Sequence, residues 1–175
     1  MDILWKLIDK IIRLINPVKY WKSKGLIVGE NCEIYRSASF GSEPYLITLG
    51  NHVRVNSGVN FITHDGGVWV LREYLKILDH EKIDLFGQII IGNNVHIGTN
   101  AIIMPNVTIG DNCIIGCGAI VTKNIPNNSI VVGIPAKVIK TIDEYVKQHI
   151  KEFDYTKQMS CTLKKNYLLK KYKKV

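Results

Sequence analysis

Histidine is the side chain best suited to accept and return a proton near neutral pH, and this chain contains five of them. His64 lies in the stretch FITHDGG, beside the carboxylate of Asp65 and just before two glycines. A histidine near neutral pKa can act as a general base that removes a proton from a hydroxyl group during its attack on a substrate. We therefore take His64 as the candidate general base and Asp65 as a second candidate catalytic residue.

The other histidines are weaker candidates. His80, in LDHEKID, is the alternative base, whereas His52, His96 and His149 lie in regular or solvated stretches. The group that orients His64 is left open, because adjacent side chains in an extended chain point apart. A backbone carbonyl or a distant carboxylate such as Glu43 is as suitable as Asp65.

The chain around these residues follows a period of six. Aliphatic residues recur at every sixth position, namely Ile91, Ile97, Ile103, Ile109, Ile115 and Val121. A second apolar residue follows each of them four positions later, while Gly, Asn, Asp, Thr and Pro occupy the positions between. This pattern predicts short strands with a turn in every hexad. Because one hexad cannot bury its apolar face alone, successive turns must stack around a shared interior.

The same six-residue spacing occurs earlier in the chain, where it is interrupted twice. The stretch GSEPY around Pro44 shifts the spacing by three residues and so predicts an enlarged corner. After Phe61 the pattern stops, and it returns only near Ile89. Residues 67–88 are therefore an excursion from the repeat, and long insertions in a repeat scaffold usually lie on the functional face. His64 lies where this excursion begins.

The two ends of the chain differ from the repeat. Residues 1–24 predict an amphipathic helix interrupted near Pro17, which caps the open end of the repeat domain at residues 25–140. Residues 141–175 predict a C-terminal helix followed by a lysine-rich basic tail, which is expected to be mobile from Met159 onward.

The net charge of +8 is concentrated at these ends. Residues 1–24 carry six basic and two acidic side chains, and residues 160–175 carry six lysines and no acid. The middle of the chain is slightly acidic, which argues against a nucleic-acid partner. The basic ends are candidates for peripheral membrane contact. The N-terminal segment is neither a leader nor a membrane span, because charges interrupt it, and four cysteines without CxxC spacing favour a reducing, cytoplasmic location.

These hexads resemble those of the hexapeptide-repeat acyltransferase superfamily over about residues 25–140. The resemblance implies an all-β fold, a left-handed parallel β-helix with short N-terminal and C-terminal helices, in which three hexads make one coil. The stretch SFGSEPYLITLGNHVRVNSGVNFITHDGGVW and the hexads from Ile89 to Lys140 resemble the O-acetyltransferases of capsule and surface polysaccharides. They are also similar to the xenobiotic and galactoside acetyltransferases.

The resemblance implies an activity and a set of site residues. It implies acetyl-coenzyme A as co-substrate, a homotrimer with active sites between neighbouring prisms, and direct transfer to a hydroxyl of a sugar or glycan. The position of His64 matches the catalytic histidine of the family. The positions implied for cofactor binding are Thr99, Cys117, Thr122, Lys123, Lys137 and Lys140. His96 departs from the family pattern, in which an aromatic residue, typically Trp, is common.

Several alternatives use the same scaffold. An N-acetyltransferase acting on a nucleotide-linked amino sugar, or a xenobiotic O-acetyltransferase, would need the same base and cofactor. A zinc hydratase of the carbonic anhydrase type needs three converging histidines, and residues 81–148 contain only His96, so no metal is expected. A non-enzymatic assembly scaffold with basic, membrane-facing ends is the remaining alternative.

Overall fold

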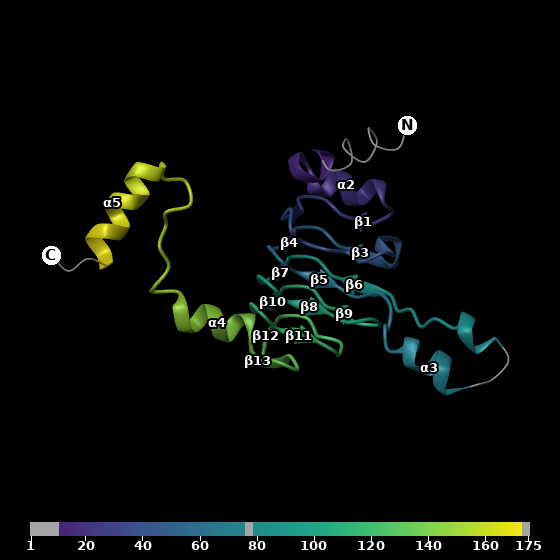
Figure 1. Cartoon of the computed structure of the whole chain (residues 1–175). Coiled ribbons are helices and arrows are strands. Elements are labelled where there is room, and N and C mark those ends of the chain that lie inside the picture. Colours follow the sequence, from purple (N-terminus) through teal and green to yellow (C-terminus); the bar gives the residue numbers. More distant parts are fainter. Residues whose placement is uncertain (1–10, 76–78, 173–175) are drawn as a thin grey trace. The chain divides into compact units, whose positions relative to one another are not determined.

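The computed structural model describes residues 11–75 and 79–172, without the side chain of His80. The chain divides into two compact units, one ending at Asp143 and one beginning at Glu144. The first unit contains three parallel sheets that stack as the faces of a coil (Figure 1). No helix among the described residues is long and apolar enough to cross a membrane.

The three middle coils each contribute one short strand to each sheet, whereas the first and last coils are incomplete. The first sheet contains, in order, β1 (Ile27–Val28), β3 (Ile47–Leu49), β6 (Ile89–Ile91) and β9 (Thr108–Ile109). The second contains β2 (Glu33–Ile34), β4 (Val53–Val55), β7 (Val95–Ile97), β10 (Cys113–Ile115) and β12 (Ser129–Val132), with β13 (Lys137–Thr141) antiparallel at its edge. The third contains β5 (Asn60–Phe61), β8 (Ile102–Ile103) and β11 (Ile120–Val121). We call these the first, second and third sheets.

The six-residue period produces this architecture directly. Strand partners in the regular coils lie 18 residues apart, so that Ile97 pairs with Ile115 and Ile103 pairs with Val121. Three hexads therefore complete one coil. The repeating aliphatic residues point inward, and Ile97, Ile103, Ile109 and Ile115 are fully buried.

Larger side chains fill the interior near the N-terminal end. The rings of Phe40 and Phe61 stack with centroids 4.6 Å apart, and Trp21 contacts Phe40 at 5.0 Å. Trp21 belongs to α2 (Pro17–Ser23), whose first turn is capped by Asn16, since the Asn16 Oδ1 accepts a hydrogen bond from Lys19 N. The helix α2 thus closes the apolar end of the coil, as the sequence led us to expect of residues 17–24; residues 1–10 of the expected cap lie outside the described residues.

The turn before each strand of the second sheet uses a left-handed residue. Asn31, His52, Asn94, Asn112 and Asn128 occupy this position, with φ between 55° and 59°. Their side chains form a ladder, in which His52 Nδ1 bonds Asn94 Oδ1 at 2.8 Å and Asn94 donates to Asn112 at 2.9 Å. Asn112 donates in turn to Asn128 at 3.0 Å. Asparagine suits this position because it tolerates positive φ better than most residues.

The second unit contains most of α4 (Ile142–His149) and all of α5 (Cys161–Tyr172). The expectation of a helix after residue 141 agrees with α4. The mobility expected of the tail from Met159 stays a prediction, and residues 161–172 within this tail form α5. The side chain of Asp154 accepts hydrogen bonds from Tyr167 Oη and Lys171 Nζ, both at 2.6 Å, and ties this helix to the segment before it.

Candidate active site

Both interruptions of the repeat occur at the same corner, where the chain passes from the third sheet to the first. The enlarged corner lies between Phe40 and β3 and contains a short 3₁₀ helix, η1 (Pro44–Leu46). The excursion leaves the next coil after β5 and returns at β6. The enlarged corner and the base of the excursion therefore belong to successive coils, and their side chains meet.

The base of the excursion is held closed by backbone pairing. His64 forms an antiparallel bridge with Phe86. The Asp65 N–H donates to Leu85 O and the Gly87 N–H donates to Thr63 O, both at 2.8 Å. The backbone of His64 is thus fixed at the point where the excursion starts and ends.

The side chain of His64 is held by a carboxylate from the enlarged corner. His64 Nδ1 lies 3.1 Å from Glu43 Oε2, and the same oxygen accepts a hydrogen bond from Thr63 Oγ1 at 2.7 Å. The Glu43 side chain is 15% exposed and that of His64 is 47% exposed. The imidazole therefore has one edge on a half-enclosed carboxylate while the rest of the ring faces solvent.

The surroundings of Glu43 favour its ionised form. The hydrogen bond from Thr63 is the main cause that lowers the pKa of Glu43 below its ordinary value, with smaller contributions from Ser42 and His64, although burial acts in the opposite direction. A carboxylate that stays ionised is a good partner for an imidazole N–H, because hydrogen bonds to charged acceptors are the stronger ones.

Asp65 has a different contact. Its Oδ1 accepts a hydrogen bond from the Gly67 N–H at 2.8 Å and so closes the turn that starts the excursion. The hydrogen-bond partner of the His64 ring is Glu43, which the sequence offered only as one of several orienting groups. Thr63 was missed altogether. The sequence feature that could have identified Thr63 is its position beside His64, in the coil that follows the enlarged corner.

The excursion continues through α3 (Val68–Tyr74) and η2 (His80–Lys82). Val68 is buried, whereas Trp69 and Tyr74 are largely exposed. Arg72 ties the two arms together, since its Nε donates to Ile83 O at 3.0 Å and its Nη2 pairs with Asp84 at 2.5 Å. The alternative base, His80, begins η2, away from the bridge that fixes His64.

Two of the residues expected to bind the cofactor lie at the corner between the second and third sheets. Thr99 and Cys117 are exposed there and stack in successive coils, where the Gly118 N–H donates to Thr99 O at 2.8 Å. The coils approach closely, because a Cβ added at Gly98 would lie 2.6 Å from Cys117 N. Within the described residues, the N–H groups of Thr99 and Cys117 have no intramolecular partner. They can therefore bind the amides of an extended ligand.

The other cofactor candidates lie elsewhere on the chain. Thr122 and Lys123 follow β11 and so belong to the corner that carries His64. Lys137 and Lys140 belong to β13 at the edge of the second sheet. A single chain therefore does not bring all six positions together. His64 follows β5 and Thr99 precedes β8, so the two residues lie at opposite ends of the strands of the third sheet.

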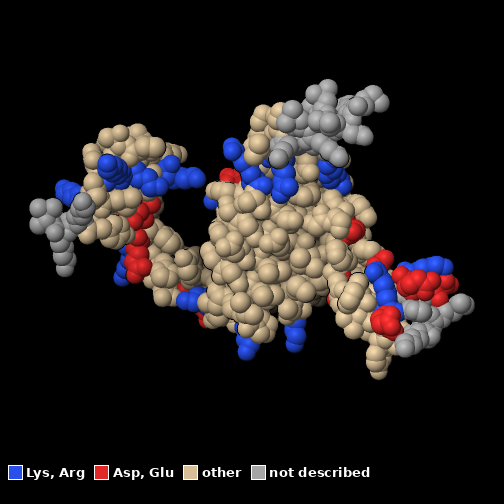
Figure 2. Space-filling view, viewed as in Figure 1, with Lys and Arg blue, Asp and Glu red and all other residues tan. Residues whose placement is uncertain are grey.

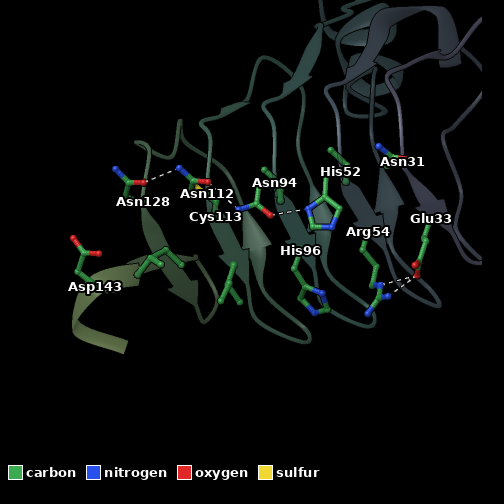
Figure 3. Close-up of a pocket in the computed structure, with 14 residues that line it drawn as sticks. Asn31, Glu33, His52, Arg54, Asn94, His96, Asn112, Cys113, Asn128 and Asp143 are labelled. Carbon is green, nitrogen blue, oxygen red and sulfur yellow. Dashed lines mark hydrogen bonds and ion pairs between the residues drawn. The ribbon is translucent and has the colours of Figure 1, made fainter. Parts of the chain in front are cut away.

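A groove with a volume of about 570 Å³ lies over the second sheet, along the ladder of Asn31, His52, Asn94, Asn112 and Asn128 (Figure 3). His96 projects into it and bonds Asn56 at 3.2 Å, next to the ion pair between Arg54 and Glu33. Burial lowers the pKa of His96 and the charge of Arg54 lowers it further, and both effects favour the neutral ring. None of the predicted site residues lines this groove. Among the described residues, no three His, Cys, Asp or Glu side chains gather into a group that would hold a metal ion.

Comparisons with known proteins identify sequence and structural relatives of this chain. A family model described as bacterial transferase hexapeptide (six repeats) matches residues 88–123. Protein CapG of Staphylococcus aureus is 52% identical over 151 residues, which cover 85% of each chain. The solved structure of a galactoside acetyltransferase in complex with coenzyme A is 28% identical over 81% of this chain and 82% of that chain, with a TM-score of 0.55. A maltose O-acetyltransferase from Clostridium difficile 630 is 26% identical over 78% and 83%, with a TM-score of 0.53.

These matches, together with the three parallel sheets, confirm the predicted fold class, a left-handed parallel β-helix with helices at both ends.

Proposed function

The chain belongs to the hexapeptide-repeat acetyltransferase family, and from this premise we propose that it transfers the acetyl group of acetyl-coenzyme A to a hydroxyl of a sugar or glycan, with His64 as the general base. The observation that carries the proposal is the contact between His64 Nδ1 and Glu43 Oε2 at 3.1 Å. It supports a defined protonation pattern, because a ring that donates Nδ1–H to a carboxylate presents a lone pair on Nε2.

In the proposed reaction His64 moves one proton twice. Nε2 accepts the proton of the acceptor hydroxyl as the oxygen attacks the acetyl carbonyl. The resulting imidazolium is stabilised by Glu43, and Nε2 returns the proton to the departing sulfur when the carbon–sulfur bond breaks. Acetyl-coenzyme A supplies the activated acetyl thioester. Glu43 is a positioning residue in this scheme. Asp65, the second predicted catalytic residue, closes the turn after His64, and the scheme gives it no proton to transfer.

The cofactor side of the proposal rests on the corner of Thr99 and Cys117. Their unpaired N–H groups and the close approach at Gly98 fit a narrow, extended arm that carries amides, such as that of coenzyme A. One of these N–H groups is also suited to stabilise negative charge on the carbonyl oxygen during attack. Lys123, Lys137 and Lys140 are the cations that we assign to the phosphates, together with the hydroxyl of Thr122.

We further propose that the site is completed by a second copy of the chain within a homotrimer. His64 lies two residues beyond Ile62, whose N–H bonds Ile103 O, whereas Thr99 lies four residues before Ile103. The two halves are therefore separated by most of the width of the third sheet within one chain. In a closed symmetric oligomer, the corner with His64 of one copy can lie against the corner with Thr99 of the next copy.

The acceptor is proposed to be a polysaccharide or a glycan precursor. The support is the identity of 52% with protein CapG, the likeness to galactoside and maltose acetyltransferases, and the resemblance of the sequence to surface-polysaccharide enzymes. We place the reaction in the cytoplasm, where acetyl-coenzyme A is available and the four unpaired cysteines stay reduced.

Complementation between two inactive variants tests the composite site. His64→Ala removes the base and Cys117→Trp fills the exposed cofactor corner, so each variant alone should be inactive. When the two are unfolded and refolded together, roughly a quarter of the sites in random trimers regain both intact halves. The measurement is thiol release from acetyl-coenzyme A in the presence of galactosides and maltose, followed by location of the label on oxygen or nitrogen. A mixture that stays inactive would show that the site lies within one chain, and label on nitrogen would favour the amino-sugar alternative.

A further inference from the structure

We propose that the ring of Phe86 is the surface on which the acceptor stacks, and that the acceptor is accordingly an uncharged sugar in its ring form. The inference rests on the proposed function, because it places the acceptor beside the base assigned there, His64. Three observations carry it: the pairing of Phe86 with His64, the exposure of the phenyl ring, and the balanced charge of the excursion.

The backbone register puts the two side chains on the same side of the chain. Phe86 and His64 are partners in the antiparallel bridge at the base of the excursion. The hydrogen bonds join the residues on either side of them, so this is a non-hydrogen-bonded pair, in which side chains approach most closely. The neighbouring Thr63 and Gly87 are buried, and side chains alternate along a strand. The phenyl ring and the imidazole therefore lie side by side on the outer surface.

The phenyl ring has free surface next to the imidazole. The centroids of the two rings are 6.2 Å apart and their planes are inclined by 69°, so the rings meet edge to face rather than stack. Such a contact covers at most one face of one ring. Phe86 is accordingly 47% exposed, whereas Phe40 and Phe61 are fully buried in the interior. Phe86 thus offers an aromatic surface directly beside the proposed base.

The excursion holds Phe86 in this place. Arg72 ties α3 to the returning arm just before Phe86, through a hydrogen bond to Ile83 O at 3.0 Å and an ion pair with Asp84 at 2.5 Å. Val68, at the start of α3, is buried. A ring that is already held in position loses little conformational freedom when it binds a ligand.

The charges of the excursion balance one another. Residues 67–88 contain three basic and four acidic side chains, and Figure 2 shows both kinds over the arm that carries α3 in Figure 1. Within the described part of this excursion, Arg72 pairs with Asp84 and Lys82 pairs with Asp79. A surface without excess positive charge does not attract phosphates. The excursion therefore favours an uncharged acceptor over a nucleotide-linked one.

A sugar ring matches this surface. One side of a pyranose ring presents C–H groups, while its hydroxyls project from the rim. The face of an aromatic ring carries partial negative charge and attracts such C–H groups, and the contact removes apolar surface from water. A general base must lie about 2.6–3.2 Å from the hydroxyl whose proton it accepts. A sugar stacked on Phe86 holds its rim of hydroxyls beside His64, where this contact can form.

Phe86→Ala tests the stacking surface in the full chain. The KM for methyl galactoside and for maltose should rise roughly tenfold, the loss expected for one aromatic contact, while kcat and the KM for acetyl-coenzyme A change less than about threefold. Phe86→Tyr keeps an aromatic face and should stay within about twofold of the wild type. Steady-state thiol release measures these constants.

Leu85→Ala is the matched control. Leu85 directly precedes Phe86 and is 54% exposed, but adjacent side chains in an extended chain point apart. This variant should keep the wild-type KM for the sugars. Circular dichroism and the thermal midpoint confirm that each variant is folded.

Galactitol is the matched acceptor, because it carries hydroxyls but has no ring. The wild type should use it at least roughly tenfold less efficiently than methyl galactoside, and Phe86→Ala should narrow this difference. Equal kcat/KM of the wild type for the two acceptors would overturn the inference.

A binding measurement separates the inference from the proposed reaction. His64→Ala, which lacks the base, should still bind methyl galactoside, and adding Phe86→Ala should weaken that binding roughly tenfold, as measured by saturation-transfer NMR. If the sugar binds in this Phe86-dependent way but the wild type releases no thiol, the proposed reaction is wrong and the sugar site remains.

Three outcomes would overturn the role of Phe86 while leaving the acetyl transfer in place. In the first, the wild type acetylates the sugars and Phe86→Ala keeps their KM. In the second, Phe86→Ala lowers kcat at constant KM, which would mean that the ring only orders His64. In the third, Leu85→Ala raises the sugar KM as much as Phe86→Ala does, so that the effect comes from the backbone of the excursion.

Discussion

His64 Nδ1 lies 3.1 Å from Glu43 Oε2, across two coils that are both irregular at this one corner. A regular hexad could not provide this contact, because inward positions must be apolar and neighbouring coils keep the same phase. The three additional residues of the first coil carry Glu43 outward, and the excursion of the second begins beside it. We infer that the enlarged corner exists to hold the histidine.

Glu43→Gln tests this positioning role. The amide can still contact the ring but no longer stabilises a positive charge, so kcat should fall roughly 10–100-fold, the range measured for groups that orient metal-bound histidines. The KM for acetyl-coenzyme A should change little, because Glu43 acts through the His64 ring in this scheme and is assigned no contact with the cofactor. Steady-state thiol release measures both constants.

Asp65→Asn is the matched control. Its amide oxygen can still accept the Gly67 N–H, so the turn persists while the charge is lost. We expect a much smaller loss of kcat than for Glu43→Gln. If Asp65→Asn were the more damaging substitution, Asp65 would be the orienting group and the role of Glu43 would be structural.

The lowered pKa of Glu43 predicts how folding depends on pH. Because Thr63 and its other hydrogen-bond partners favour the carboxylate, the folded-state pKa lies below the ordinary 4.5. The resulting stabilisation is fully present above pH 4.5 and is lost as the pH falls through the folded-state value. Denaturant unfolding of the wild type and of Glu43→Gln should therefore converge in free energy at acid pH. A difference that is independent of pH would contradict the origin of the shift.

The aromatic layer near the N-terminal end should dominate stability. Phe40→Ala removes a buried ring that stacks on Phe61 and contacts Trp21, which should cost about 3–5 kcal/mol of unfolding free energy. Phe153→Ala, at an exposed ring in the second unit, should cost less than about 1 kcal/mol. Urea denaturation followed by Trp fluorescence measures the difference; comparable losses would mean that the layer is not a shared core.

Two substitutions of Asn112, in the asparagine ladder, distinguish the contribution of backbone conformation to stability from that of the side-chain hydrogen bonds. Asn112→Gly keeps the positive φ but removes the hydrogen bonds to Asn94 and Asn128, whereas Asn112→Ala also forces a Cβ-bearing residue without a polar side chain into the left-handed region. The alanine variant should be less stable than the glycine variant by about 1 kcal/mol. Thermal unfolding of the pair measures this, and the reverse order would show that the backbone relaxes out of this conformation.

The sequence was sufficient for the fold because the repeat is a local property. Ile97, Ile103 and Ile109 each mark one face of the coil, and their uniform spacing fixes strand length, phase and interior together. The interruption of this spacing also identified the excursion and drew attention to His64, which lies where the excursion begins. It could not show which carboxylate meets the ring, because Glu43 is 21 residues earlier and its position depends on the shape of the enlarged corner.

Other features could not be predicted from the sequence for similar reasons. Thr63 occupies the third position of its hexad, where Thr99 and Cys117 are exposed in other hexads, and its role appears only when the corner of the preceding coil lies beside it. Helix α5 was not predicted, because residues 161–172 are rich in lysine and lack the regular apolar spacing by which the N-terminal helix was recognised.

The central claim is that the imidazole of His64 performs the proton transfer. The most direct test is the rate of thiol release from acetyl-coenzyme A by His64→Ala, measured with the sugar acceptor that gives the highest wild-type turnover. Because the side chain is 47% exposed, the variant should keep its thermal midpoint while kcat falls by ~10²–10⁴. A folded His64→Ala variant that turns over at the wild-type rate would contradict the account.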